Sequence, residues 1–145
     1  MQGQAVSCIF CSIIAGDAPA EIVFEDDSVM AFMDINPASP GHTLVVPKEH
    51  FQDLMDIEPD LAAAVMRVAT RVSRAAKRSL GSDGVNLFLA SGRAAFQSVF
   101  HVHMHVIPRW QDDGLRPPWR PARGNTSEIH VAAGHIRDQL RSHEE

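Results

Sequence analysis

The stretch "FHVHMHVIPRW", Phe100–Trp110, places a histidine at every second position. Successive side chains of a β-strand point to opposite faces, so alternate residues share one face. We therefore predict a strand over 100–108 that ends at Pro108, because proline lacks the N–H that a sheet needs. One face would carry apolar side chains toward the core, and the other would carry the three histidines, His101, His103 and His105.

A row of imidazoles suggests chemistry, because imidazole ionises near neutral pH and can act as a nucleophile, an acid or a donor to phosphate. Two functional interpretations of the row stay open at this point: a three-histidine metal site and a phosphoryl-transfer site. Metalloenzymes usually take two histidines from neighbouring strand positions and their other ligands from elsewhere. A purely structural role would require three alternating histidines to occur by chance, which is improbable for so rare a residue.

The composition is that of an ordinary globular protein. The chain has 145 residues, 45% of them hydrophobic and 21% charged, which predicts a single domain over 1–145. Its net charge of -5 argues against general binding to nucleic acid or to anionic membranes. No apolar run approaches the roughly 18 residues of a spanning helix, and "MQGQAVSCIF" at the N-terminus lacks the pattern of a secretion signal. We expect a cytoplasmic protein.

Hydrophobic patterning and turn residues predict four more strands, over 21–25, 28–35, 42–48 and 85–91. A long helix begins at Pro59 and ends before Gly81, since proline suits a first helical turn and glycine the residue past the end. A second helix starts near Thr126, with Thr126 or Ser127 as its cap. The predicted class is α+β: an antiparallel sheet of about five strands with a long helix across one face, and a C-terminal helix.

Both cysteines of the chain lie in one C-x-x-C, Cys8 and Cys11. Without a secretion signal, this spacing favours a metal or redox site over a structural disulfide. Thiolates are good zinc ligands, and histidines can complete a tetrahedral set. A redox pair and two ordinary buried thiols are the alternatives that the spacing leaves open.

The histidine row and its surroundings resemble the histidine triad (HIT) superfamily, whose signature alternates three histidines with apolar residues. "HVHMHV" has this form, "QSVFHVHMHVIPRW", Gln97–Trp110, resembles the whole signature, and the segment 8–50 resembles the family's N-terminal half. The likeness covers about 8–110 as a core and leaves 111–145 as a tail. It is nearest to the small Hint-like and bacterial HIT branch, which implies a homodimer with two nucleotide sites.

The resemblance also implies a reaction. In the family the middle histidine, here His103, attacks the α-phosphorus of a nucleotide, and water then releases a nucleoside monophosphate from a covalent nucleotidyl-histidine. His105 would donate to a phosphate oxygen, and Gln97 and Ser98 would contact the phosphate or the leaving group. Such donors suit the charge that develops on the phosphoryl oxygens.

The resemblance places the nucleoside in the N-terminal half. Asp34 would bind the ribose, since a carboxylate can accept two hydrogen bonds from a cis-diol, with turn capping as the alternative. Apolar positions around a purine base, for some of which a simple core role is equally open, would be Phe10, Ile13, Phe32 and Ile35. A structural zinc ion, with no open coordination position, would be held by Cys8, Cys11, His50 and His101. His42 and the tail histidines receive no role.

Two positions depart from the family pattern. Ala90 stands where the family often has asparagine, and Phe96 stands where glycine usually precedes the glutamine. The nucleophile is intact, so the sequence predicts a nucleotide hydrolase or transferase acting on nucleoside phosphoramidates or related purine nucleotide conjugates. The alternatives are a dinucleoside polyphosphate hydrolase, a weakly active nucleotide-binding interaction protein and a three-histidine metalloenzyme.

Overall fold

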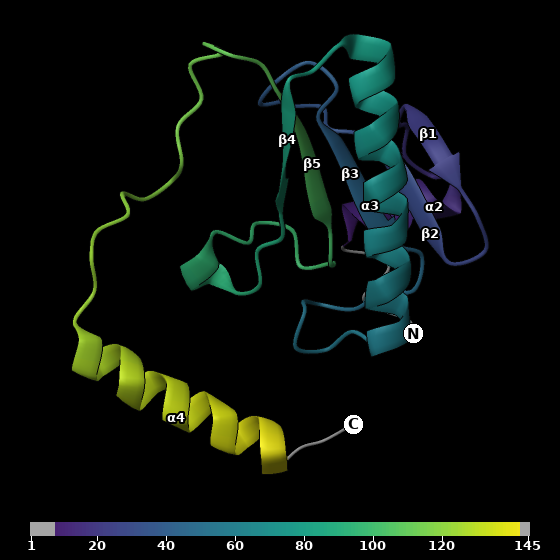
Figure 1. The fold of residues 1–145 in the computed structure, drawn as a ribbon. Coiled ribbons are helices and arrows are strands. Elements are labelled where there is room, and N and C mark those ends of the chain that lie inside the picture. Colours follow the sequence, from purple (N-terminus) through teal and green to yellow (C-terminus); the bar gives the residue numbers. More distant parts are fainter. Residues whose placement is uncertain (1–7, 143–145) are drawn as a thin grey trace. The chain divides into compact units, whose positions relative to one another are not determined.

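Five strands form one antiparallel sheet in the order β1-β2-β3-β5-β4 (Figure 1). The computed structural model describes residues 8–142. The strand bounds are β1 Ile22–Glu25, β2 Val29–Met33, β3 Thr43–Pro47, β4 Gly84–Phe88 and β5 Met104–Arg109. With two long helices, α3 (Pro59–Leu80) and α4 (Thr126–Ser142), this architecture confirms the predicted α+β class. The chain divides into two units, 1–114 and 115–145, which are described separately.

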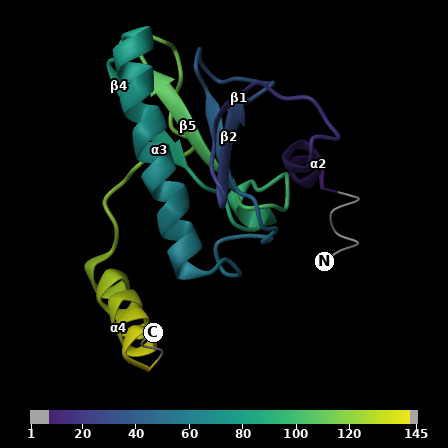
Figure 2. The ribbon, with the colours of Figure 1, turned by 90° about the vertical axis from the view of Figure 1, so that its right-hand side faces the viewer.

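Helix α3, Pro59–Leu80, covers one face of the sheet (Figure 2). Val65, Val68 and Ala69 on its buried side pack with alternate residues of the strands, including Val45 and Val106. The helix begins at proline as predicted, and it ends at Gly81, whose φ of 70° is a left-handed conformation that glycine adopts at little cost. The stripe of apolar residues in the sequence therefore identified the face that is buried.

The opposite face of the sheet carries a short helix that the sequence analysis did not predict. Helix α2, Ile9–Ala15, buries Phe10 and Ile13 against residues of β2 and β3 that alternate with those facing α3. It is seven residues long and nearly all apolar, so it lacks the period by which an amphipathic helix is recognised. The cysteines and histidines of the candidate site, described in the next subsection, lie on this α2 side of the sheet.

The strand predicted over 100–108 is shorter than expected. β5 begins at Met104, so His101 and His103 precede the sheet ladder, while His105 lies inside it. The N–H of Val102 donates instead to the carbonyl of Phe51, 2.9 Å away, which lies outside the five strands. β4 likewise ends at Phe88 rather than at 91, and a 3-10 turn, η1, follows at Arg93–Ala95.

The second unit contains helix α4, Thr126–Ser142. Its cap is Asn125 and not Thr126 or Ser127 as predicted: the Asn125 side-chain oxygen accepts hydrogen bonds from the Glu128 N–H and the Ser127 hydroxyl. Asparagine serves as well as serine in this position, and Asn125 directly precedes the first residue of the helix. Within residues 8–142, no helix combines the length and apolar character needed to cross a bilayer.

Candidate functional site

Four potential metal ligands converge on the α2 side of the sheet: Cys8, Cys11, His50 and His101, here called the Cys/His cluster. Cys8 caps α2, since its sulfur accepts the N–H of Cys11, and Cys11 lies in the first turn of the helix. His50 follows β3, and His101 precedes β5. The fold thus brings three separate segments to one point.

The geometry of the Cys/His cluster fits a zinc ion. The sulfur-to-Nδ1 distances are 3.4 Å for Cys8–His101, 3.3 Å for Cys11–His50 and 3.6 Å for Cys11–His101. The two Nδ1 atoms of His50 and His101 are 3.1 Å apart. The edges of a tetrahedron around zinc, with bonds of roughly 2.0–2.3 Å, are about 3.3–3.8 Å.

The protonation of His101 also suits a metal ligand. Its Nε2–H donates to the carbonyl of Pro47 at 2.8 Å, which leaves the lone pair of Nδ1 directed at the cluster. Burial, more than any other cause, lowers the pKa of this imidazole to about 4, so the ring is neutral at pH 7. Burial and the neighbouring Cys8 raise the pKa of the Cys11 thiol to about 11. A bound cation would favour the thiolate, so metal binding would release protons.

His103 is held in the orientation that a nucleophile requires. Its ring is almost fully buried, and its Nδ1–H donates to the carbonyl of His101 at 2.8 Å. Because a carbonyl can only accept, the proton stays on Nδ1 and the lone pair of Nε2 is available. Burial lowers the pKa of His103, so the ring is neutral at pH 7. A neutral imidazole with a directed lone pair can attack phosphorus.

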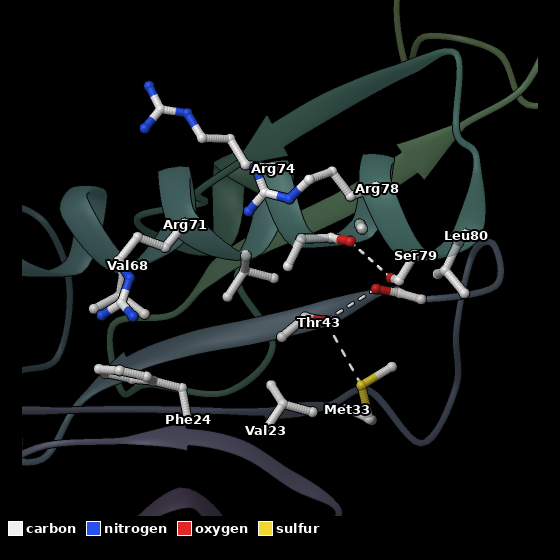
Figure 3. A pocket seen from close by; sticks show the side chains of 14 residues that line it. Val23, Phe24, Met33, Thr43, Val68, Arg71, Arg74, Arg78, Ser79 and Leu80 are labelled. Carbon is white, nitrogen blue, oxygen red and sulfur yellow. Dashed lines mark hydrogen bonds between the residues drawn. The ribbon is translucent and has the colours of Figure 1, made fainter.

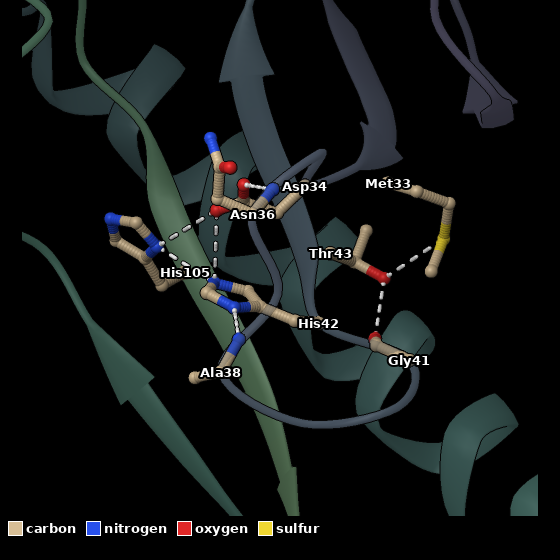
Figure 4. Close-up of polar contacts among 8 residues, drawn as sticks. All are labelled: Met33, Asp34, Asn36, Ala38, Gly41, His42, Thr43 and His105. Carbon is tan, nitrogen blue, oxygen red and sulfur yellow. Dashed lines mark hydrogen bonds and ion pairs between the residues drawn. The ribbon is translucent and has the colours of Figure 1, made fainter.

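His105 is linked to His42, a residue to which the sequence analysis gave no role (Figure 4). The N–H of Ala38 donates to Nδ1 of His42 at 2.9 Å, so the proton of a neutral His42 lies on Nε2. That Nε2 is 2.9 Å from Nδ1 of His105, which must accept, so His105 carries its own proton on Nε2. Burial lowers the pKa of both rings, that of His105 to about 4. A chain of fixed tautomers therefore makes His105 a hydrogen-bond donor.

Asp34 completes a second group of ligand-type residues, Asp34, His42 and His105, here called the Asp/His cluster. One Asp34 oxygen accepts the N–H of Asn36, which is the turn-capping role left open by the sequence. Its other oxygen lies 3.4 Å from Nε2 of His42 and 4.0 Å from Nδ1 of His105 (Figure 4). The proton on Nε2 of His42 occupies the position through which that ring would bind a metal, so this cluster is suited to hydrogen bonding.

The apolar residues predicted around a base are not alike. Phe10, Ile13 and Phe32 are buried in one cluster on the α2 side, whereas Ile35 is 90% exposed. Phe10 also meets the histidines edge-on, with ring centroids 5.9 Å from His101 and 5.1 Å from His103. The same side chain therefore packs against a ring of the Cys/His cluster and against the candidate nucleophile.

The loop before the histidines is closed by Gln97. The side-chain oxygen of Gln97 accepts the N–H of Gly92, and its amide nitrogen donates to the carbonyls of Gln52 and Val99. Gln97 is buried with these bonds, and Ser98 is exposed. Phe96 has a φ of 74°, which costs a non-glycine residue on the order of 1 kcal/mol. Ala90, the other departure from the family pattern, is buried.

A separate hollow of about 560 Å³ lies on the α3 side of the sheet (Figure 3). Its floor is largely apolar, with Phe24, Val68 and Leu80 among its residues, and exposed arginines of α3 stand beside it. The histidines and cysteines of the two clusters are not among the residues that line it. The hollow therefore belongs to a different surface from the candidate site.

The sequence analysis missed His42 because its role depends on strand pairing. His42 directly precedes β3, and β3 pairs with β5 so that Leu44 faces His105. This register brings His42 to His105, which is 63 positions away. A histidine next to a central strand was the available signal, but sequence spacing alone does not give the register.

Comparison with known proteins identifies the family. The model of the HIT domain matches residues 15–112. The adenosine 5'-monophosphoramidase hnt1 of Schizosaccharomyces pombe is 34% identical over 137 residues, 94% of this chain and 100% of that protein. The adenylylsulfatase HINT3 of Arabidopsis thaliana is 41% identical over 108 residues, 74% of this chain and 55% of that protein.

Solved structures agree with this result. A crystal structure of a Zn-bound histidine triad family protein from Mycobacterium smegmatis is 42% identical, with a TM-score of 0.75 over 94% of this chain and 99% of that chain. The family model covers most of the chain and includes the three alternating histidines. The chain belongs to the HIT family.

Proposed function

We propose that the chain is a nucleotide hydrolase that cleaves the α-phosphate bond of nucleoside phosphoramidates or related purine nucleotide conjugates. The observation that carries the proposal is the hydrogen bond from Nδ1–H of His103 to the His101 carbonyl, at 2.8 Å. This bond fixes a neutral ring with its Nε2 lone pair available for attack on phosphorus. The coarser conclusion, a nucleotide hydrolase, is supported by the activities named for the fission yeast and plant relatives.

The proposed reaction has two displacements. In the first, a bond forms between Nε2 of His103 and the α-phosphorus, the P–N bond breaks, and the amine leaves after it takes up one proton. In the second, water gives its hydroxyl to phosphorus and releases one proton, and the Nε2–P bond breaks. His105 would donate its Nε2–H to a phosphate oxygen during both steps, because its Nδ1 already accepts from His42.

The nucleoside would lie on the α2 side of the sheet. Asp34 would accept hydrogen bonds from the ribose with the oxygen that does not cap the Asn36 turn. Exposed Ile35 and the apolar cluster of Phe10, Ile13 and Phe32 would meet a purine base. Ser98, which is exposed, would lie toward the phosphate and the leaving group, and Gln97, whose side-chain amide bonds Gly92, Gln52 and Val99, would hold that loop in place.

A zinc ion in the Cys/His cluster would have a structural role. When bound, it would cross-link α2 to the segments that hold His50 and His101, and four protein ligands would leave no position for a substrate. The relative from Mycobacterium smegmatis is a zinc-bound member of the family, which supports this assignment. The homodimer implied by the family resemblance stays a prediction, which sedimentation velocity can test.

The proposed function is tested with an adenosine phosphoramidate as substrate. His103→Ala should lower kcat/KM by at least about 10³-fold, because the covalent route is lost. Wild-type protein mixed rapidly with substrate should give a chain heavier by one adenylyl group, with the modification on His103. His130→Ala is the control, because His130 is exposed on α4. Undiminished turnover by His103→Ala would reject the mechanism.

The same assay separates the alternatives. Faster turnover of diadenosine polyphosphates than of the phosphoramidate would identify a dinucleoside polyphosphate hydrolase. Tight binding of nucleoside monophosphates without turnover of either substrate would identify an interaction protein.

A further inference from the structure

Phe96 has a backbone conformation that its side chain does not favour. Its φ is 74° and its ψ is 19°, in the left-handed region where a Cβ meets steric repulsion. Among the described non-glycine residues, Asp112 is the other one with a positive φ, and aspartate tolerates this region better than phenylalanine does. Strained positions of this kind cluster at functional sites, and an observed outlier is a reason to look for a function.

Burial of the ring does not explain why phenylalanine stands there. The Phe96 side chain is 65% exposed, so it adds little to the core. The conformation is imposed by the loop: the N–H of Phe96 donates to the Arg93 carbonyl, and Gly92 and Gln97 exchange two hydrogen bonds. Glycine would satisfy the same backbone bonds without repulsion from a Cβ. What phenylalanine adds is an exposed aromatic ring.

The loop that carries this ring is firmly held. Gln97, the next residue, is buried, and its side chain bonds the carbonyls of Gln52 and Val99 as well as the N–H of Gly92. The backbone under Phe96 is therefore anchored to the segment that leads into the histidines. An aromatic ring on a fixed backbone has few torsions to immobilise, so it offers contact area at a low entropic cost.

The strand order indicates on which side of the candidate site the Phe96 ring lies. β5, which continues from the histidine segment, lies between β3 and β4 in the sheet. The nucleoside residues of the proposed function come from α2, β2 and the residues after β2, on the β3 side of β5. The Phe96 loop follows β4, on the other side of β5. With the nucleoside over the first side, as in the proposed function, the leaving group would be directed to the second side, toward the loop of Phe96 and Ser98.

We propose that Phe96 determines leaving-group specificity, with its ring stacking on a planar aromatic group carried by the amine of a nucleoside phosphoramidate. The inference rests on the proposed function and specifies its substrate class. Aromatic rings favour offset stacking or edge-to-face contact with one another, and an aliphatic amine of similar basicity cannot make that contact. The residue acts on substrate selection, while the bond-breaking chemistry stays with His103.

The test compares two adenosine phosphoramidates, one made from 2-phenylethylamine and one from propylamine. Wild-type protein should favour the aromatic substrate in kcat/KM, and Phe96→Gly should reduce that preference by about three- to tenfold. Phe96→Tyr is the matched control, because it keeps both the ring and the backbone strain, and it should keep the preference. Phe96→Gly should also raise the unfolding temperature by a few degrees, since glycine relieves the strain.

Each outcome decides between the two proposals. An unchanged preference in Phe96→Gly, with both substrates still hydrolysed, overturns the role of Phe96 and leaves the proposed function standing. Failure of wild-type protein to hydrolyse either substrate overturns both. A loss of preference that Phe96→Tyr shares equally would show that loop structure, and not the aromatic ring, is responsible, and would also overturn the proposal.

Discussion

The Cys/His cluster and the Asp/His cluster lie on the same side of one sheet, and each contains two histidines; the other potential ligands are two cysteines in the first and one aspartate in the second. They also differ in the backbone group that bonds the histidine nitrogen on the side away from the cluster: this group is a carbonyl at His101 and an N–H at His42. The Nε2–H of His101 donates to the Pro47 carbonyl, which leaves the lone pair of Nδ1 available for a metal. Nδ1 of His42 accepts the N–H of Ala38, so the proton of this ring lies on Nε2, the nitrogen that faces the cluster. Proximity of ligand-type residues is therefore insufficient to define a metal site, and the backbone partner decides.

The largest effect expected from this difference is on metal content. Cys11→Ser should lose the zinc ion proposed for the Cys/His cluster, because a neutral hydroxyl replaces a thiolate in the ligand set. His42→Gln should keep the zinc ion, because the Asp/His cluster takes no part in binding it. Elemental analysis after dialysis measures both, with circular dichroism to confirm that each variant is folded. Equal loss of zinc from the two variants would show that the clusters are not distinct in this way.

A smaller effect is expected on catalysis through His42. His42→Phe removes the donor to His105 and should lower kcat/KM on an adenosine phosphoramidate by about 10–100-fold, since the His105 tautomer is no longer fixed. His42→Gln keeps an N–H near the position of Nε2 and should recover much of the loss. Zinc content should be unchanged in both. A phenylalanine variant as active as the glutamine variant would contradict the tautomer chain.

The smallest effect expected is on the pH dependence of stability. Burial lowers the pKa of His105 to about 4 from an ordinary value of 6.5, so between these values the unfolded chain binds more protons at this residue than the folded chain. Its contribution to the free energy of unfolding is complete above pH 6.5 and is lost as the pH falls toward 4. His105→Asn should reduce that loss by on the order of 1 kcal/mol. Urea unfolding at pH 7 and pH 5 measures the difference, and identical pH dependence in both proteins would contradict the inferred burial effect.

The sequence predicted the parts of the fold that depend on local patterns. Period-2 and period-3.6 patterns identified the five strands and both long helices, and Pro59 and Gly81 marked the ends of α3. Helix α2 was not predicted, because its seven residues are nearly all apolar and no period distinguishes its faces. The late start of β5 was not predicted, because alternation shows which side chains share a face but does not show where the hydrogen bonds between strands begin.

The site was predictable where the chemistry follows from residue type and the family pattern. The Cys/His cluster came together as the resemblance implied, and His103 has the acceptor at Nδ1 that a nucleophile needs. The link between His42 and His105 was not predictable, because it depends on the register of β3 against β5. Tautomers could not be predicted for the same reason: they are set by backbone atoms of Ala38, Pro47 and His101 that only the fold brings into place.

His101 contributes through two chemically independent atoms, an imidazole nitrogen to the Cys/His cluster and a main-chain oxygen to His103. Every amino acid has that oxygen, so mutation of the side chain cannot delete it. The hydrogen-bond acceptor of the candidate nucleophile is thus protected against side-chain mutation, and rotation of the peptide plane between residues 101 and 102 would disturb it. The Val102 N–H, which belongs to that plane, is held by the Phe51 carbonyl. The peptide group between residues 51 and 52 therefore helps to fix the orientation of the candidate nucleophile, and insertions there should misalign His103 without changing any side chain of the site.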